Sequence, residues 1–83
     1  MRIDELLNKI RWDPRLKSKF FRVTYIHRGA ERGTLDITYE RIRGIFKSFF
    51  TYLNDAEEEI VIPYHRIVKI TDDSCNQVIY RKK

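Results

Sequence analysis

The chain has 83 residues, a formal net charge of +5 and 42% hydrophobic residues, among them five Phe, five Tyr and one Trp. A chain this short builds one hydrophobic core, so we expect a single domain over residues 1–83. The aromatic content excludes an intrinsically disordered chain, and no apolar run reaches the roughly 18 residues of a membrane span. Asp4 and Glu5 stand where a secretory leader would be basic or apolar, so we expect a cytoplasmic protein without a membrane partner.

The first predicted element is a short helix. Its apolar residues recur at helical spacing, at Ile3, Leu6, Leu7 and Ile10. Asp13-Pro14 ends this pattern, because the residue before a proline is pushed out of the helical region. Trp12 either packs beside the apolar stripe or marks a surface, and its large apolar area favours packing.

A β-hairpin is predicted next. Residues 20–28 are rich in aromatic and β-branched side chains and alternate in polarity, as in a strand. Residues 34–39 alternate again, and the segment 29–33 between them contains two glycines that suit a turn.

Residues 42–53 fit two structures. Their apolar residues have helical spacing, whereas Gly44 and the run Phe49-Phe50-Thr51-Tyr52 favour a strand. We predict a strand from about 45 to 53, because the family resemblance described below implies one.

The last third predicts three more strands. Residues 58–62 form the first, and Pro63 requires an edge or a bend because it has no backbone donor. Residues 67–71 and 77–80 form a terminal hairpin, and no internal repeat is visible. The predicted fold is α+β, with an N-terminal helix and a curled, mainly antiparallel sheet of five or six short strands, or a partial barrel.

Two His-Arg pairs are the main chemical feature. His27-Arg28 and His65-Arg66 contain the only histidines, and they stand beside the backbone-shaping residues Gly29 and Pro63. An imidazole can donate a hydrogen bond to phosphate, and a guanidinium matches two phosphate oxygens. The pairs form one anion site if they converge, or they are unrelated strand ends. Two histidines are too few for a zinc site, and we expect no metal or other cofactor.

Basic residues concentrate in the first fifty positions, which carry twelve basic and six acidic side chains. Such an excess attracts polyanions, nucleic acids above all, although it also occurs on ordinary solvated surfaces. The densest run is Lys9, Arg11, Arg15, Lys17, Lys19, Arg22, Arg28 and Arg32. We interpret it as a possible track for a phosphate backbone.

Four segments carry a family resemblance. They read Leu-Asn-Lys-Ile-Arg-Trp (7–12), Tyr-Ile-His-Arg-Gly (25–29), Ser-Phe-Phe (48–50) and Ile-Pro-Tyr-His-Arg-Ile (62–67). In this order they resemble a family of small, mostly archaeal uncharacterised proteins, whose domain is proposed to recognise cyclic phosphates at RNA ends during RNA repair. The resemblance covers roughly residues 3 to 81. It implies that His27, Arg28, Tyr64, His65 and Arg66 contact the RNA end, with Gly29 and Pro63 shaping the backbone.

Three functions follow from these features. The first is an RNA-binding module that recognises a terminal phosphate, most specifically a 2′,3′-cyclic phosphate. The second is an accessory domain that binds an RNA ligase or nucleotidyltransferase. The third is a phosphodiesterase or ribonuclease in which His27 and His65 are general base and acid. We rank binding first and catalysis last, because no known catalytic motif is present.

Overall fold

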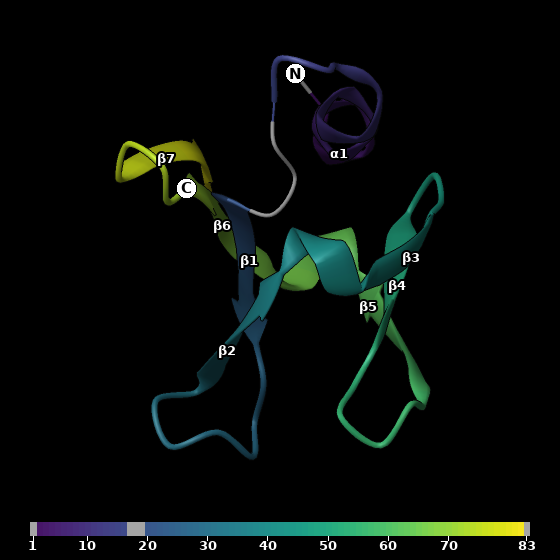
Figure 1. The fold of residues 1–83 in the computed structure, drawn as a ribbon. Coiled ribbons are helices and arrows are strands. Elements are labelled where there is room, and N and C mark those ends of the chain that lie inside the picture. The colour runs from purple at the N-terminus through teal and green to yellow at the C-terminus, as the bar shows by residue number, and fades with distance from the viewer. Residues whose placement is uncertain (1, 17–19, 83) are drawn as a thin grey trace.

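The structure is a computed structural model that describes residues 2–16 and 20–82. These residues form one α-helix, α1 (Ile3–Trp12), seven strands and two short 3-10 helices (Figure 1). The strands are β1 (Phe21–Ile26), β2 (Thr34–Thr38), β3 (Ile42–Ile45), β4 (Phe49–Leu53), β5 (Glu59–Pro63), β6 (Ile67–Asp72) and β7 (Gln77–Arg81). The 3-10 helices are η2 (Tyr39–Arg41) and η3 (Tyr64–Arg66).

The strands form two antiparallel sheets. Sheet A has the order β2-β1-β6-β7, and sheet B has the order β3-β4-β5. Figure 1 shows α1 at one end of the two sheets, and the β1–β2 and β4–β5 loops at the opposite end. The α+β prediction is confirmed, but the described residues form seven strands in two separate sheets, not one curled sheet or a partial barrel of five or six strands. The seventh strand arises because residues 42–53 form two strands, and the division into two sheets arises at η2 and η3, which turn the chain from one sheet into the other.

The segment 42–53 is a hairpin rather than one strand. The strand prediction has the right type, but β3 and β4 are separated by a tight turn in which the Phe46 amide donates to the Phe49 carbonyl at 2.9 Å. Inward-facing residues of the two antiparallel strands, such as Ile42 and Phe50, are both buried. Their spacing across the turn therefore imitates a helical stripe.

The N-terminal helix is confirmed, and its apolar stripe faces the sheets. Leu7 and Ile10 are buried, and the buried Tyr39 hydroxyl donates a hydrogen bond of 2.6 Å to the Leu7 carbonyl. The prediction that Trp12 packs is wrong, because its side chain is 77% exposed. At 100° per residue, Trp12 lies on the far side of the helix from the stripe that ends at Ile10.

The fold contains an internal duplication. We call β1-β2-η2-β3 the first half and β4-β5-η3-β6 the second half. The β1–β2 and β4–β5 hairpins have the same register: Val23 pairs with Ile37 as Phe50 pairs with Ile62, and the four neighbouring pairs also correspond. The expectation of no repeat is therefore wrong at the level of structure.

Each half completes the other's sheet. Strand β3 of the first half pairs with β4 of the second, and β6 of the second half pairs with β1 of the first. The β-bulges also correspond. In β3 and in β6 the register shifts directly after the first paired residue, which is Ile42 in β3 and Ile67 in β6. Only α1 and β7 have no counterpart in the other half among the described elements.

The duplication is visible in the sequence once the registers align it. The identical pairs are Thr24/Thr51, Tyr25/Tyr52, Ile37/Ile62, Tyr39/Tyr64, Arg41/Arg66, Ile42/Ile67 and Ile45/Ile70. Tyr25 and Tyr52 meet between the sheets, where their hydroxyls are 2.5 Å apart in a buried hydrogen bond. The repeat is not visible in the sequence alone, because the loops of the two halves differ in length and most other paired positions carry different residues.

Candidate functional site

The two His-Arg pairs lie at the same end of sheet A. In the β1–β6 ladder Tyr25 pairs with Ile67, so the residues that follow β1 and the residues that precede β6 lie at the same end of the sheet. The first pair follows the last residue of β1, and the second pair belongs to η3, directly before β6. The backbone therefore brings together two segments that are 38 positions apart in the sequence.

A surface depression of about 250 Å³ lies where the pairs meet. It is lined by Ile26, Arg28, His65, Arg66 and Lys82. Within the described residues no carboxylate forms an ion pair with Arg28, Arg66 or Lys82. Three cationic side chains therefore line one hollow without an internal counter-ion, which favours an anionic ligand.

Lys82 is a member of the site that the sequence analysis did not identify. Its amide donates to the Val68 carbonyl at 2.7 Å, which extends the β6–β7 ladder by one residue. Its ammonium donates to the His65 carbonyl at 2.5 Å, which places the charge beside η3. Register counting from the predicted terminal hairpin would have located it, since Lys82 stands opposite the beginning of β6.

His27 lies beside the depression rather than in its lining. Its amide donates to the Gly33 carbonyl at 2.8 Å, which closes the β1–β2 loop. Its ring packs edge-on to Tyr25, with centroids 6.2 Å apart. A Cβ atom added to Gly29 would lie 3.2 Å from Cε1 of His27. The absence of a side chain at Gly29 therefore leaves room for the His27 ring above the turn that follows β1.

Tyr64 supports the site from behind. Its ring stacks on buried Phe50 with centroids 6.3 Å apart, and its hydroxyl donates to the Phe46 carbonyl at 2.5 Å. Burial raises the pKa of Tyr64 to about 12. Pro63 ends the edge strand β5 with φ −63° and caps η3, so both residues fix the turn that carries His65 and Arg66.

The basic run from Lys9 to Arg32 does not form one continuous stripe. Arg15 pairs with Asp13, and Arg22 pairs with both Asp36 and Asp73 at 3.3 and 3.2 Å. Lys17 and Lys19 lie outside the described residues. Arg28 and Arg32 belong to the β1–β2 loop, at the opposite end of the molecule from α1, which carries Lys9 and Arg11 (Figure 1).

A larger depression of about 570 Å³ continues along the outer face of sheet A. Its lining includes Thr24, Arg32, Lys69 and Arg81, together with the carboxylates of Glu31 and Asp36. Thr24 is two residues from Ile26 on β1, and Arg81 precedes Lys82, so this depression borders the smaller one. The end of sheet A thus offers a cationic hollow next to a mixed polar groove.

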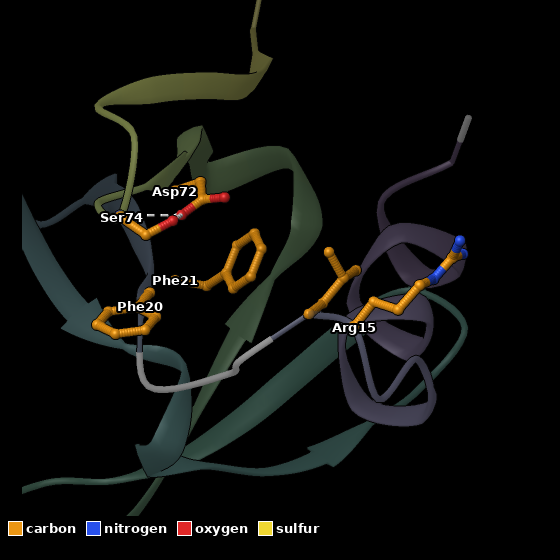
Figure 2. A pocket seen from close by; sticks show the side chains of 6 residues that line it. Arg15, Phe20, Phe21, Asp72 and Ser74 are labelled. Atoms are coloured by element: carbon orange, nitrogen blue, oxygen red, sulfur yellow. Dashed lines mark hydrogen bonds between the residues drawn. The ribbon is translucent and has the colours of Figure 1, made fainter.

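A third hollow lies at the other end of β1. Figure 2 shows Phe20, Phe21, Asp72 and Ser74 together on one side of it, and Arg15 on the other side, next to the helix. The Arg15 side chain extends away from Asp72 in this view, and Asp13 neutralises it. No predicted site residue lines this hollow, and the described residues contain no His, Cys, Asp or Glu group arranged to hold a metal.

Comparison with known families assigns the chain to one of them. A profile described as the MJ1316 RNA cyclic group end recognition domain matches residues 1–82. The chain belongs to this family. The match confirms the resemblance inferred from the His-Arg-Gly and Ile-Pro-Tyr-His-Arg-Ile segments.

Curated relatives of the chain match nearly its whole length. UPF0248 protein MJ1316 of Methanocaldococcus jannaschii is 32% identical over 83 residues, which span 98% of this chain and 94% of the relative. UPF0248 proteins of Methanococcus maripaludis and Saccharolobus islandicus are each 32% identical, over 81 and 82 residues, and are covered to 99% and 100%. No solved structure matches the chain significantly. No helix in the described part of the chain is long and apolar enough to cross a membrane.

Proposed function

We propose that the protein binds the 2′,3′-cyclic phosphate end of an RNA strand at the depression between Arg28, His65, Arg66 and Lys82. The observation that carries the proposal is the convergence of three cations and one imidazole on a hollow without an internal counter-ion. The family's description as a domain for RNA cyclic group end recognition supports the same ligand.

The chemistry of the lining suits a terminal phosphate. A guanidinium donates two parallel hydrogen bonds to the two free oxygens of a phosphodiester, and a lysine adds a point charge. The His65 imidazole supplies one further donor at its protonated nitrogen. Tyr64 and Pro63 would act indirectly in this arrangement, by holding η3, and His27 would border the terminal ribose.

The neighbouring groove gives the rest of the nucleotide a place to lie. Its basic residues can contact sugar and phosphate groups, which carry no sequence information. A binding mode of this type reads the chemistry of the RNA end and tolerates many sequences. We therefore expect specificity for the terminal group rather than for the bases.

The test is a titration of the protein with matched RNA oligomers that end in 2′,3′-cyclic phosphate, 3′-phosphate or 3′-hydroxyl. The proposal predicts the tightest binding for the cyclic end. Arg66→Gln should weaken that binding by about tenfold or more, as expected for a lost charge-assisted hydrogen bond. Arg43→Gln, at the exposed position of β3, is the matched control. Equal affinity for the three ends would reduce the function to general RNA binding.

The same oligomers test the enzymatic alternative. Because one imidazole, His65, lines the depression while His27 packs over Gly29, the arrangement favours binding over two-histidine catalysis. We expect the cyclic phosphate to survive prolonged incubation with the protein. Ring opening that disappears in a His27→Ala, His65→Ala double variant would instead establish a phosphodiesterase.

A further inference from the structure

The internal duplication supplies a second copy of the anion site, with different residues. Arg66 of η3 corresponds to Arg41 of η2, and His65 corresponds to Glu40. The two 3-10 helices have nearly the same flanking geometry. The residue before η3, Pro63, has φ/ψ of −63°/145°, and the residue before η2, Thr38, has −77°/147°. The residues that follow η3 and η2 are Ile67, with −71°/126°, and Ile42, with −71°/129°.

The loops that face these helices also correspond. In the β1–β2 loop the His27 amide donates to Gly33, and the Ala30 amide donates back to the His27 carbonyl. In the β4–β5 loop the Asn54 amide donates to Glu58, and the Glu57 amide donates back to Asn54. Arg28 and Asp55 therefore occupy the same position, the first residue inside the same kind of turn.

The two copies differ in charge at this position. In one copy Arg41 forms an ion pair of 2.8 Å with Asp55 and also donates to the Leu53 carbonyl at 3.3 Å. In the other copy Arg66 shares its depression with Arg28, where the carboxylate would stand, and with Ile26, the counterpart of Leu53. The ion pair of one half is thus replaced by two cations in the other.

We propose that the Arg41–Asp55 ion pair is a self-occupied copy of the anion site, and that a bound phosphate contacts Arg66 where the Asp55 carboxylate contacts Arg41. This inference deepens the proposed function and rests on it for the identity of the ligand. A carboxylate and a cyclic phosphodiester both present two terminal oxygens that share one negative charge, and both match the guanidinium fork. Arg66 is therefore the main clamp, and Arg28 keeps the site open by withholding a carboxylate.

The first test closes the site. Arg28→Asp places a carboxylate where Asp55 stands in the other copy, and Arg28→Asn is the matched control without the charge. The Arg41–Asp55 pair is exposed, and exposed pairs contribute up to about 1 kcal/mol. We therefore expect Arg28→Asp to bind uridine 2′,3′-cyclic monophosphate about two- to fivefold more weakly than Arg28→Asn, because the internal carboxylate competes for Arg66. Both substitutions lie in an exposed turn, so both variants should fold. Equal affinities of the two variants would overturn the inference.

The second test has two experiments. The first follows the Arg66 signal without any ligand, and the second converts the Arg41–Asp55 copy into a binding site. In labelled Arg28→Asp protein, the Arg66 side-chain NMR signal should acquire the salt dependence of the Arg41 signal, which reports its ion pair with Asp55. Glu40→His with Asp55→Arg should raise the number of bound uridine 2′,3′-cyclic monophosphate molecules from one to two, whereas Asp55→Asn should leave it at one. An unchanged Arg66 signal, or a double variant that still binds one molecule, would contradict the inference.

The two sets of results separate the inference from the proposed function. If the Arg66 signal changes as described but oligomers with cyclic and hydroxyl ends bind equally, the duplicated site stands and end recognition fails. If end recognition holds but Arg28→Asp behaves like Arg28→Asn, the function stands and the correspondence with Arg41–Asp55 fails.

Discussion

The hydrogen bond between Tyr25 and Tyr52 joins the two halves, and removing it tests the packing of the duplicated core. The hydroxyls are 2.5 Å apart, and the side chains are 1% and 7% exposed. Replacing one tyrosine with phenylalanine leaves the other hydroxyl buried without its partner, which costs about 1–3 kcal/mol of unfolding free energy. For a domain of this size, 1 kcal/mol corresponds to a Tm shift of about 4–8 °C.

The two single substitutions should differ in size. Tyr52 borders a surface depression, so its hydroxyl can find water when Tyr25 is replaced. Tyr25 has no such access, and Tyr52→Phe should therefore be the more destabilising of the two. The double variant removes both hydroxyls together, and it should be no less stable than Tyr52→Phe alone.

Urea unfolding of the wild type, the two single variants and the double variant gives the coupling free energy between the hydroxyls. We expect a coupling of about 1 kcal/mol or more, since residues in direct hydrogen-bonded contact are not additive. Additive losses in the double variant would refute the claim that the two halves are joined by a buried hydroxyl pair.

Three further predictions concern a turn, a titration and an exposed ring. Gly33 has φ +77°, so Gly33→Ala should lower the unfolding free energy by about 1 kcal/mol, and Gly33→Asn by less; equal losses would argue against strain. The raised pKa of Tyr64 implies a stabilisation that is complete below about pH 10 and lost as pH rises to about 12. Tyr64→Phe should therefore show a smaller fall in Tm over that range, and an identical fall would contradict the assignment. Trp12→Ala should change stability by less than about 0.5 kcal/mol, and iodide should quench the wild-type tryptophan nearly as well in the folded as in the unfolded state.

Local patterns predicted most of the secondary structure. Hydrophobic periodicity indicates which face of a helix or strand is buried. It predicted the helix around Leu7 and Ile10 and the terminal hairpin that begins at Ile67. The β3–β4 hairpin was not predicted, because apolar residues of two antiparallel strands have the same spacing as one helical stripe. The 3-10 helices were not predicted either, because three-residue elements such as Tyr64–Arg66 are too short to show a hydrophobic period.

The candidate site was predictable in composition but not in arrangement. The His-Arg pairs are visible as the only histidines, and β-strand register, which no local pattern determines, brings Arg28 and Arg66 to one depression. Lys82 stands at the end of a strand with no sequence motif, so only the ladder places it. Trp12 was expected to pack by its size, whereas its position on the helix decided its exposure.

Charge balance alone could not separate the two copies of the site. Arg41 and Arg66 look alike in the sequence, because each stands two residues after a tyrosine and directly before an isoleucine. Their difference lies in the residue across the turn, Asp55 in one copy and Arg28 in the other. Such a contrast requires knowledge of which loop faces which 3-10 helix, and this comes from the topology.

The most direct test of the account is a map of where the terminal phosphate binds. Labelled wild-type protein would be titrated with uridine 2′,3′-cyclic monophosphate, and side-chain NMR signals of the arginines, lysines and histidines would be followed. We predict that the largest shifts occur at Arg66, Arg28, His65 and Lys82, and that the Arg41 signal stays unchanged. Shifts centred on Arg41, or spread evenly over the basic residues, would contradict the central claim that one half of this duplicated fold holds an open anion site.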